Sequence, residues 1–241
     1  MTKRLPTGLY ALTPDTVDDD WLAMAVEAAI RGGASAVQYR NKVADAAQRL
    51  RQAQRLARLC REAGTLFIVN DTVALANAVN ADGLHIGRDD GDPATVRAAL
   101  GSQPVLGVSC YDSFERARAV RGIADYVAFG SVFVSAVKPG AVRAPLGLFA
   151  RAREAGMHAV AIGGIDAGNA YEVAQAGAEA VAVITAVFGE AGGAGRADAA
   201  QIGVNARRVV ETFVTGLRTT TSGPDASAKL SRIASMRTKR E

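Results

Sequence analysis

The sequence predicts an α/β protein, a single (β/α)8 TIM barrel over residues 1–221. Eight short apolar segments alternate with amphipathic segments along the chain. The apolar segments contain few polar residues, as expected of parallel strands that are buried on both faces. The length of 241 residues also suits one α/β barrel, which needs about 200–250 residues. A doubly wound open sheet is the alternative, but no glycine-rich dinucleotide motif follows the first apolar segment.

Each expected strand is a short run rich in Val, Ile, Leu and Ala. In chain order the expected strands are Leu9–Thr13, Ala36–Arg40, Leu66–Asn70, Gly83–Gly87, Val105–Ser109, Tyr126–Gly130, Ala159–Gly163 and Ala180–Thr185. Six of them follow a glycine, a residue that commonly ends the preceding helix: Gly33, Gly64, Gly101, Gly122, Gly156 and Gly177. The strand starts therefore form a rim of turns, whereas polar residues gather at the strand ends.

Helices are expected between the strands, because apolar residues recur there with a helical period. They cover about 18–31, 44–63, 72–79, 93–100, 113–121, 146–155, 167–176 and 204–217. The helix over 44–63 has the clearest pattern, with Ala53, Leu56 and Cys60 on one face and arginines on the other. Catalytic groups of such barrels lie at the C-terminal ends of the strands, so the functional residues are sought there.

Composition excludes several classes of protein. Two cysteines, Cys60 and Cys110, are too few for a disulfide framework and fit a reducing cytoplasm. No apolar run approaches the ~20 residues of a membrane span, and the first residues lack the apolar core of a signal peptide. We therefore expect a cytoplasmic protein with no membrane partner. The sequence leaves the oligomeric state open, and a homo-oligomer is among the states it allows.

The net charge of +4 comes mainly from the end of the chain. Residues 222–241 contain five Lys and Arg but only two acidic residues, and they offer little apolar surface to bury. Such a composition predicts a disordered basic tail rather than a part of the barrel. The remaining charge is close to balanced, so the sequence gives no reason to expect a nucleic-acid partner.

Two strand ends terminate in carboxylates that are nineteen residues apart, at Asp71 and Asp90. This interval is about one helix plus one strand, so the two side chains should lie at neighbouring strand ends. Mg²⁺ prefers such oxygen ligands, and it often binds one or two carboxylates together with a substrate phosphate. The alternative is that both residues only cap helices that start at Thr72 and Pro93.

The segment from Gln38 to Lys42 places alternate side chains on one side of a strand as it ends. Gln38, Arg40 and Lys42 can therefore converge on one ligand. Two cations and an amide suit an anion with many oxygens. The alternative is that Arg40 forms a structural ion pair with an acidic residue.

Further candidates follow the later strands. Lys138 lies in a long connection, where barrels often have binding loops. Gly163-Gly164 and the helix start after Thr185 expose backbone N–H groups at the positions where barrels commonly bind phosphate. No His or Asp is arranged near Ser109 in the sequence as a nucleophile would require. Ser109 is instead expected to donate a hydrogen bond to a ligand. His85, within a strand, and His158, at the rim of turns, are interpreted as structural.

Several motifs together resemble the thiamine phosphate synthase family over about residues 8–190. They are Val37-Gln38-Tyr39-Arg40-Asn41-Lys42, Asn70-Asp71, Ala81-Asp82-Gly83-Leu84-His85-Ile86-Gly87, Gly107-Val108-Ser109, Ala161-Ile162-Gly163-Gly164-Ile165 and Ala182-Val183-Ile184-Thr185. The resemblance implies a barrel enzyme that joins 4-amino-5-hydroxymethyl-2-methylpyrimidine diphosphate to a thiazole phosphate. The products would be thiamine phosphate and pyrophosphate.

The resemblance also implies a set of site residues. The pyrimidine diphosphate would be bound by Gln38, Arg40, Lys42, Asn70, Ser109 and Lys138, and the thiazole phosphate by Ser135 and its neighbours, Gly164, Ile184 and Thr185. Tyr39, Asn41 and Val137 complete the expected substrate-binding set, and Asp71 and Asp90 would hold Mg²⁺. Arg40, Lys42 and Lys138 are the expected catalytic residues. Mg²⁺ and the lysines would neutralise the charge on departing pyrophosphate, so the bond-forming step needs no general base.

Two other functions fit the same fold. A related thiazole tautomerase would transfer a proton instead of joining two substrates, but it has no diphosphate to bind. A non-catalytic ligand-binding barrel would not need the carboxylate pair together with the cations. The residues at the strand ends therefore favour the synthase over both alternatives.

One loop departs from the family pattern. The family commonly has Pro-Thr-x-Thr-Lys, whereas this chain has Val134-Ser135-Ala136-Val137-Lys138. Val137 cannot donate a hydrogen bond, which is typically worth about 0.5–1.5 kcal/mol. Val137→Thr is therefore expected to lower the Michaelis constant for the thiazole substrate, measured by steady-state kinetics. An unchanged constant would mean that this position does not contact the ligand.

Overall fold

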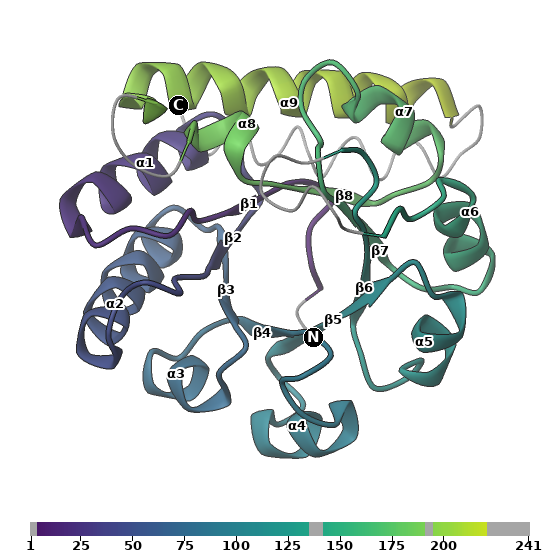
Figure 1. The fold of residues 1–241 in the computed structure, drawn as a ribbon, viewed down its shortest axis with the longest axis horizontal. Helices are drawn as coiled ribbons and strands as arrows, with labels where there is room; N and C mark the ends of the chain where they lie inside the picture. Colours follow the sequence, from purple (N-terminus) through teal and green to yellow (C-terminus); the bar gives the residue numbers. More distant parts are fainter. Residues whose placement is uncertain (1–3, 135–141, 191–194, 221–241) are drawn as a thin grey trace.

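The computed structural model describes residues 4–134, 142–190 and 195–220. Eight parallel strands form a closed barrel in chain order (Figure 1). The strands are β1 (Gly8–Leu12), β2 (Ala36–Tyr39), β3 (Leu66–Asn70), β4 (Gly83–Ile86), β5 (Val105–Tyr111), β6 (Tyr126–Phe129), β7 (Ala159–Ile162) and β8 (Ala180–Val183). The predicted TIM barrel is confirmed, and the open-sheet alternative is excluded because β1 pairs with β8. The boundary at residue 221 and the predicted tail lie outside the described residues.

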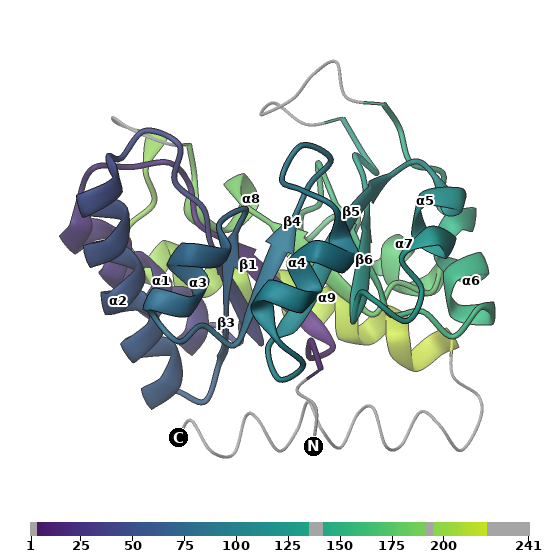
Figure 2. The same ribbon diagram turned by 90° about the horizontal axis from the view of Figure 1, so that it is seen from below.

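Helices surround the barrel on its outer side (Figures 1 and 2). They are α1 (Asp19–Arg31), α2 (Ala46–Glu62), α3 (Val73–Ala78), α4 (Pro93–Leu100), α5 (Phe114–Ala119), α6 (Gly147–Glu154), α7 (Ala170–Gln175), α8 (Thr185–Phe188) and α9 (Ala199–Thr220). No described helix is long and apolar enough to cross a membrane.

The end of the chain differs from the prediction in two ways. The expected helix over 204–217 is the central part of α9, which begins at Ala199 because Asp198 accepts a hydrogen bond from the backbone N–H of Gln201 at 2.8 Å. The expected helix start after Thr185 corresponds to the short helix α8, but the expected helix ranges do not include it, because its few apolar residues continue the apolar pattern of β8. Helix α9 packs along α1 and α7, and Gly32 allows the close approach to Ala206.

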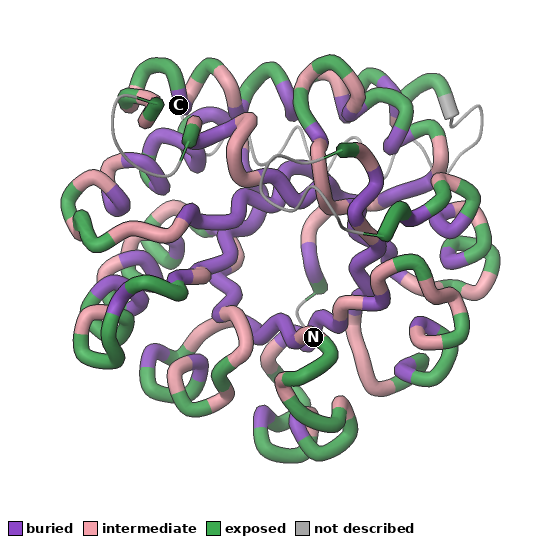
Figure 3. Tube along the Cα trace, viewed as in Figure 1, coloured by how far each residue is buried: buried purple, intermediate pink, exposed green. Residues whose placement is uncertain are grey.

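Side chains alternate between two apolar regions, one between strands and helices and one inside the barrel. In β1, Tyr10 and Leu12 belong to the interior cluster, whereas Leu9 and Ala11 belong to the outer one. Leu5, which precedes β1, belongs to the interior cluster and is 2% exposed. The strands form a ring of buried backbone, while the outer helices are exposed on their far sides (Figure 3).

The two rims of the barrel have different roles. In the side view, the loops that follow the strands lie at the upper edge (Figure 2). At the opposite rim, glycines end helices with positive φ, such as Gly64 at 64° and Gly156 at 70°. At the upper rim, the hydroxyl of Thr13 donates to the carbonyl of Arg40 at 2.8 Å and accepts from its N–H at 2.9 Å. The ends of β1 and β2 are thereby held together.

Gly107 provides a test of the interior packing. A Cβ at this position of β5 would lie 2.0 Å from Cζ of Tyr126. We expect Gly107→Ala to lower the free energy of unfolding by about 1–3 kcal/mol, measured by urea denaturation, because overpacking displaces the ring. Gly147→Ala is the control, since nothing lies within 4 Å of the added Cβ. Equal unfolding midpoints for the two variants would contradict this packing.

Candidate active site

A cavity of about 310 Å³ opens between the ends of β2 and β3, on the rim where the site is expected. Six of the expected site residues line it: Tyr39, Arg40, Asn41, Lys42, Asn70 and Asp71. Arg49, from the first turns of α2, also lines it and was not predicted. Sequence could have indicated Arg49 only by its place soon after a strand end, since α2 contains several arginines.

Asp71 and Asp90 come together, as their interval in the sequence predicts. The two carboxyl groups are neighbours, since both hydrogen bonding with Asp90 and its charge contribute to the pKa of Asp71. Burial and the adjacent Asp90 raise the pKa of Asp71 to about 6, although the charges of Lys42 and Arg40 oppose this shift. An acidic pair beside two cations is therefore the main electrostatic feature of the site.

Helix capping does not explain these carboxylates. Thr72 is the N-cap of α3, and its side chain makes no capping bond. Asp92, not Asp90, caps α4 by accepting from the N–H of Thr95 at 2.9 Å. Asp90 instead accepts from the N–H of Gly87 at 2.6 Å, and Asp71 has a φ of 67°, which is uncommon for a non-glycine residue. Both carboxylates are thus placed by tight turns at the strand ends.

Within the described part of the chain, no group of three or more His, Cys, Asp or Glu side chains could hold a metal ion. A metal at Asp71 and Asp90 would therefore have two protein ligands. This is sufficient for Mg²⁺, which usually keeps several waters and binds substrate phosphates as well. The donor set consists of carboxylate oxygens, which suits a hard cation.

Arg40 has an acidic partner that the sequence did not reveal. Its Nη1 donates to both carboxylate oxygens of Asp15, at 3.0 and 3.1 Å, and the N–H of Lys42 donates to the same carboxylate at 2.8 Å. The guanidinium bonds among the described residues use Nη1 alone, so Nε and Nη2 remain for a ligand. The structural ion pair and the ligand-binding role of Arg40 are therefore compatible. Asp15 follows β1 closely, and its position at a strand end is the signal that could have identified it.

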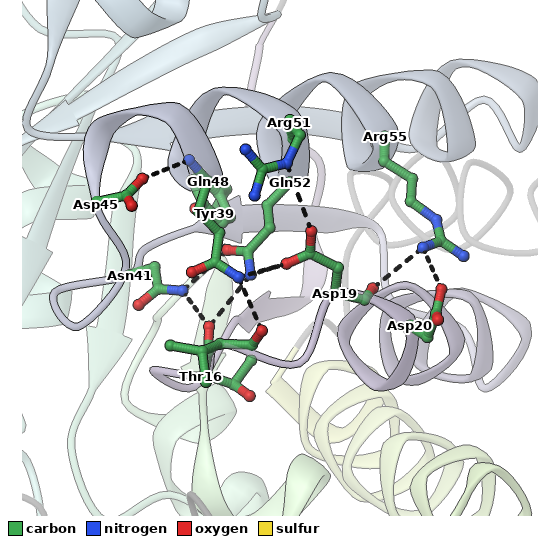
Figure 4. A network of polar contacts seen from close by, with 11 residues as sticks. Thr16, Asp19, Asp20, Tyr39, Asn41, Asp45, Gln48, Arg51, Gln52 and Arg55 are labelled. Carbon is green, nitrogen blue, oxygen red and sulfur yellow. Dashed lines mark hydrogen bonds and ion pairs between the residues drawn. The ribbon is translucent and has the colours of Figure 1, made fainter.

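Tyr39 and Asn41 use their polar groups within the protein (Figure 4). The Tyr39 hydroxyl donates to Oε1 of Gln52 at 2.8 Å, and Nδ2 of Asn41 donates to the same oxygen at 2.9 Å. Asn41 also donates to the carbonyl of Thr16 at 2.5 Å, while Gln52 donates to Asp19 at 2.7 Å. Both residues line the cavity, but these bonds tie their side chains to α2 and to the loop after β1.

Gln38 and Ser109 lie at the interior side of the rim. Gln38 is 2% exposed and donates to the Tyr10 hydroxyl at 2.7 Å. The Ser109 hydroxyl is 2.8 Å from Nε2 of His85, so this histidine touches an expected binding residue. His158 lies at the opposite rim, buried, with Nδ1 3.2 Å from Glu179.

The glycine pair after β7 is needed for packing. A Cβ at Gly163 would lie 2.1 Å from Oγ of Ser131, and one at Gly164 would lie 2.3 Å from the carbonyl of Val134. Ile184 packs against the interior cluster, and Thr185 begins α8. Gly164, Ile184 and Thr185 thus stand at adjacent strand ends, as predicted. The expected residues Ser135, Val137 and Lys138 lie outside the described residues.

Comparisons with known proteins agree with this arrangement. A family model described as thiamine monophosphate synthase matches residues 9–187. A thiamine-phosphate synthase from Chromobacterium violaceum is 58% identical over 182 residues, which make up 75% of this chain and 88% of that protein. A thiamine-phosphate synthase from Bordetella pertussis is 52% identical over 214 residues, covering 85% of this chain and 99% of that protein.

The fold comparison gives the same result. The solved structure of a thiamine phosphate pyrophosphorylase from Pyrococcus furiosus is similar to this chain with a TM-score of 0.73 and 30% sequence identity. The matched region covers 88% of this chain and 97% of the chain in that structure. The chain belongs to the thiamine monophosphate synthase family.

Proposed function

We propose that this chain joins a pyrimidine diphosphate to a thiazole phosphate and so forms thiamine phosphate and pyrophosphate. In this reaction the bond between the pyrimidine methylene and the diphosphate oxygen breaks, and its electrons leave with pyrophosphate. The lone pair of the thiazole nitrogen then forms the new C–N bond. The observation that supports the proposal most strongly is the convergence of Arg40, Lys42 and Asp71 at one cavity, with Asp90 beside Asp71.

The cations of the cavity fit the leaving group. Arg40, Lys42 and Arg49 line the same opening and would bind diphosphate oxygens before and after the bond breaks. Their charge favours the transition state because negative charge grows on the leaving oxygen. Asp15 holds Arg40 and the backbone of Lys42, which reduces the freedom of both groups before the substrate arrives. Lys138 keeps the same role as a proposal from the sequence.

We propose Asp71 and Asp90 as the ligands of Mg²⁺. Two neighbouring carboxylates repel each other when both are ionised, and the raised pKa of Asp71 reflects this repulsion together with burial. A divalent cation would relieve it. When bound, Mg²⁺ supplies positive charge that stabilises the departing pyrophosphate. Among the described residues, the pair provides the oxygen donors that such a cation prefers.

The bond-forming step needs no general base, and the histidine nearest the site fits that requirement. Burial lowers the pKa of His85 to about 4, so its ring is neutral at pH 7. No histidine lines the cavity among the described residues.

One observation favours the tautomerase as a second candidate, since a carboxyl group with a pKa of about 6 suits a general base. The cytoplasmic location and the lack of a nucleic-acid partner remain predictions from the sequence, and a homo-oligomer remains one of the states that the sequence allows.

The function is tested by incubating the purified protein with both substrates and Mg²⁺. We expect thiamine phosphate and pyrophosphate in equal amounts, detected by chromatography, and no product after chelation with EDTA. Isomerisation of a thiazole carboxylate alone would support the tautomerase instead. Binding of the substrates without any product would support the non-catalytic barrel.

Asp71→Asn tests the carboxylate pair. Because the folded-state pKa of Asp71 is about 6, above the ~3.9 of an unfolded aspartate, the folded protein holds an extra proton between these values. Its stability therefore falls as the pH rises from about 4 to 6. Without divalent cations, Asp71→Asn should remove this decline in thermal melts. With Mg²⁺, it should reduce turnover on the order of 100-fold.

Asp92→Asn is the matched control, since Asp92 lies in the same loop as Asp90, after β4, but caps α4. It should change the stability little, because Asn caps a helix about as well as Asp, and it should retain turnover. If Asp71→Asn retained near-normal turnover, Asp71 would have no part in the mechanism. If the wild-type melts showed no such pH dependence, the two carboxyl groups would not interact as described.

A further inference from the structure

Five polar side chains inside the barrel form one continuous hydrogen-bonded chain. Nε2 of Gln38 is 2.7 Å from the Tyr10 hydroxyl, which is 2.9 Å from the Tyr126 hydroxyl. The Tyr126 hydroxyl is 3.0 Å from Nδ1 of His85, and Nε2 of His85 is 2.8 Å from Oγ of Ser109. The members come from β2, β1, β6, β4 and β5, so the chain crosses the barrel. We call it the interior chain.

The middle of the interior chain is sealed from solvent. Tyr10 and Tyr126 are 2% and 1% exposed, and His85 is 8% exposed. The Tyr126 ring stacks on the His85 ring with centroids 5.6 Å apart, and the missing side chain at Gly107 leaves room for it. Burial raises the pKa of both tyrosines and lowers that of His85 to about 4, so all three are neutral at pH 7.

Neutral groups restrict how the protons can be arranged. Each tyrosine hydroxyl has one hydrogen to donate, and a neutral imidazole has one N–H donor and one acceptor nitrogen. A hydroxyl can also accept at both of its junctions, but its own hydrogen is then left without an acceptor in the interior chain, which is costly for a buried group. Only two arrangements satisfy every junction and also use the hydrogen of each tyrosine, and they run in opposite directions.

In the first arrangement, Gln38 donates to Tyr10, the donation continues to Nδ1 of His85, and Nε2–H donates to Ser109. The Ser109 hydroxyl is then free to donate to a ligand, and the Gln38 carbonyl oxygen is free to accept. In the second arrangement, Ser109 donates to His85 and Tyr10 donates to the turned amide of Gln38. Ser109 can then only accept from a ligand, and the Gln38 amide donates.

We propose that Tyr10, Tyr126 and His85 are positioning residues that couple the hydrogen-bonding characters of Gln38 and Ser109. When one of these two residues offers an acceptor to the substrate, the other offers a donor. The inference rests on the proposed function, in which Gln38 and Ser109 contact the pyrimidine substrate. The matching ligand is a heteroaromatic ring that presents one donor and one acceptor, as an aminopyrimidine does.

The coupling can be tested on the free protein, without any substrate. The ¹⁵N chemical shifts of the His85 ring report which nitrogen bears the proton. We expect Gln38→Ala, three junctions away from His85, to change these shifts, because removing the amide removes one constraint on direction. In a Tyr126→Phe background, the same Gln38→Ala substitution should have no effect on His85.

Gln52→Ala is the matched control, because Gln52 is a glutamine that is also 2% exposed but lies outside the interior chain. It should leave the His85 shifts unchanged in both backgrounds. Insensitivity of His85 to Gln38→Ala in the otherwise wild-type protein would overturn the proposal. The proposal would also be overturned if Gln38→Ala changed the His85 shifts equally with and without the Tyr126 hydroxyl. If Tyr126→Phe does not fold, Tyr10→Phe interrupts the interior chain at the next junction and gives the same comparison.

Binding gives a second readout that a purely structural role would not move. Tyr126→Phe should weaken binding of the pyrimidine diphosphate by about 2- to 13-fold in calorimetry, since one hydrogen bond is typically worth 0.5–1.5 kcal/mol. Affinity for inorganic pyrophosphate should be unchanged, because the interior chain's hydrogen bonds among the described residues do not include the side chains of Arg40, Lys42 or Arg49. An equal loss for both ligands would indicate general disruption and contradict the proposal.

The two proposals fail separately. Normal condensation by the wild-type protein together with an unresponsive His85 would remove only the coupling. If His85 responds but the protein forms no thiamine phosphate, the coupling between Gln38 and Ser109 would stand. Their assignment to the pyrimidine substrate would not.

Discussion

The structure brings two carboxylates together at one edge of a closed barrel, despite their mutual repulsion. Asp71 and Asp90 follow β3 and β4, which pair in parallel, so their turns cannot separate without opening the sheet. Burial increases the cost of ionising both groups. Arg40 and Lys42 offset part of this cost from the end of β2. The arrangement has a clear physical reason if a divalent cation and a multiply charged anion bind there.

The surrounding loops hold this charge distribution rigidly. The loop after β1 contacts the loop after β2 through Asp15 and Arg40, and through the Thr16 carbonyl and Asn41. Gln52 of α2 completes this contact by bonding Tyr39 and Asn41 (Figure 4). A preorganised set of cations stabilises the charge of a leaving group with little reorganisation during the reaction. The polar side chains that line the cavity therefore divide into those that we propose bind the ligand and those that fix the loops.

Sequence could predict the features that depend on local pattern. Apolar strands at regular intervals indicated the barrel, and the position of Asp71 and Asp90 at successive strand ends indicated that they meet. Sequence could not predict contacts between distant elements, such as the Asp15–Arg40 ion pair or the Tyr10–Tyr126 bond, which spans 116 residues. The interpretation of His85 as structural missed its bond to Ser109, because alternation along one strand does not show which side chain of the neighbouring strand lies beside it. The start of α9 was missed because its cap, Asp198, lies in an Ala- and Gly-rich segment with weak periodicity.

The central claim is that Asp71 and Asp90 form a strained acidic pair that a divalent cation relieves. The most direct test is to follow the ¹³C shift of the Asp71 carboxyl against pH, with and without Mg²⁺ and inorganic pyrophosphate. We expect a midpoint near 6 for the free protein, since the pKa of Asp71 is raised to about 6, and a clear decrease of that midpoint when both ligands are present. An ordinary aspartate midpoint in the free protein, or a midpoint that Mg²⁺ does not change, would contradict the account.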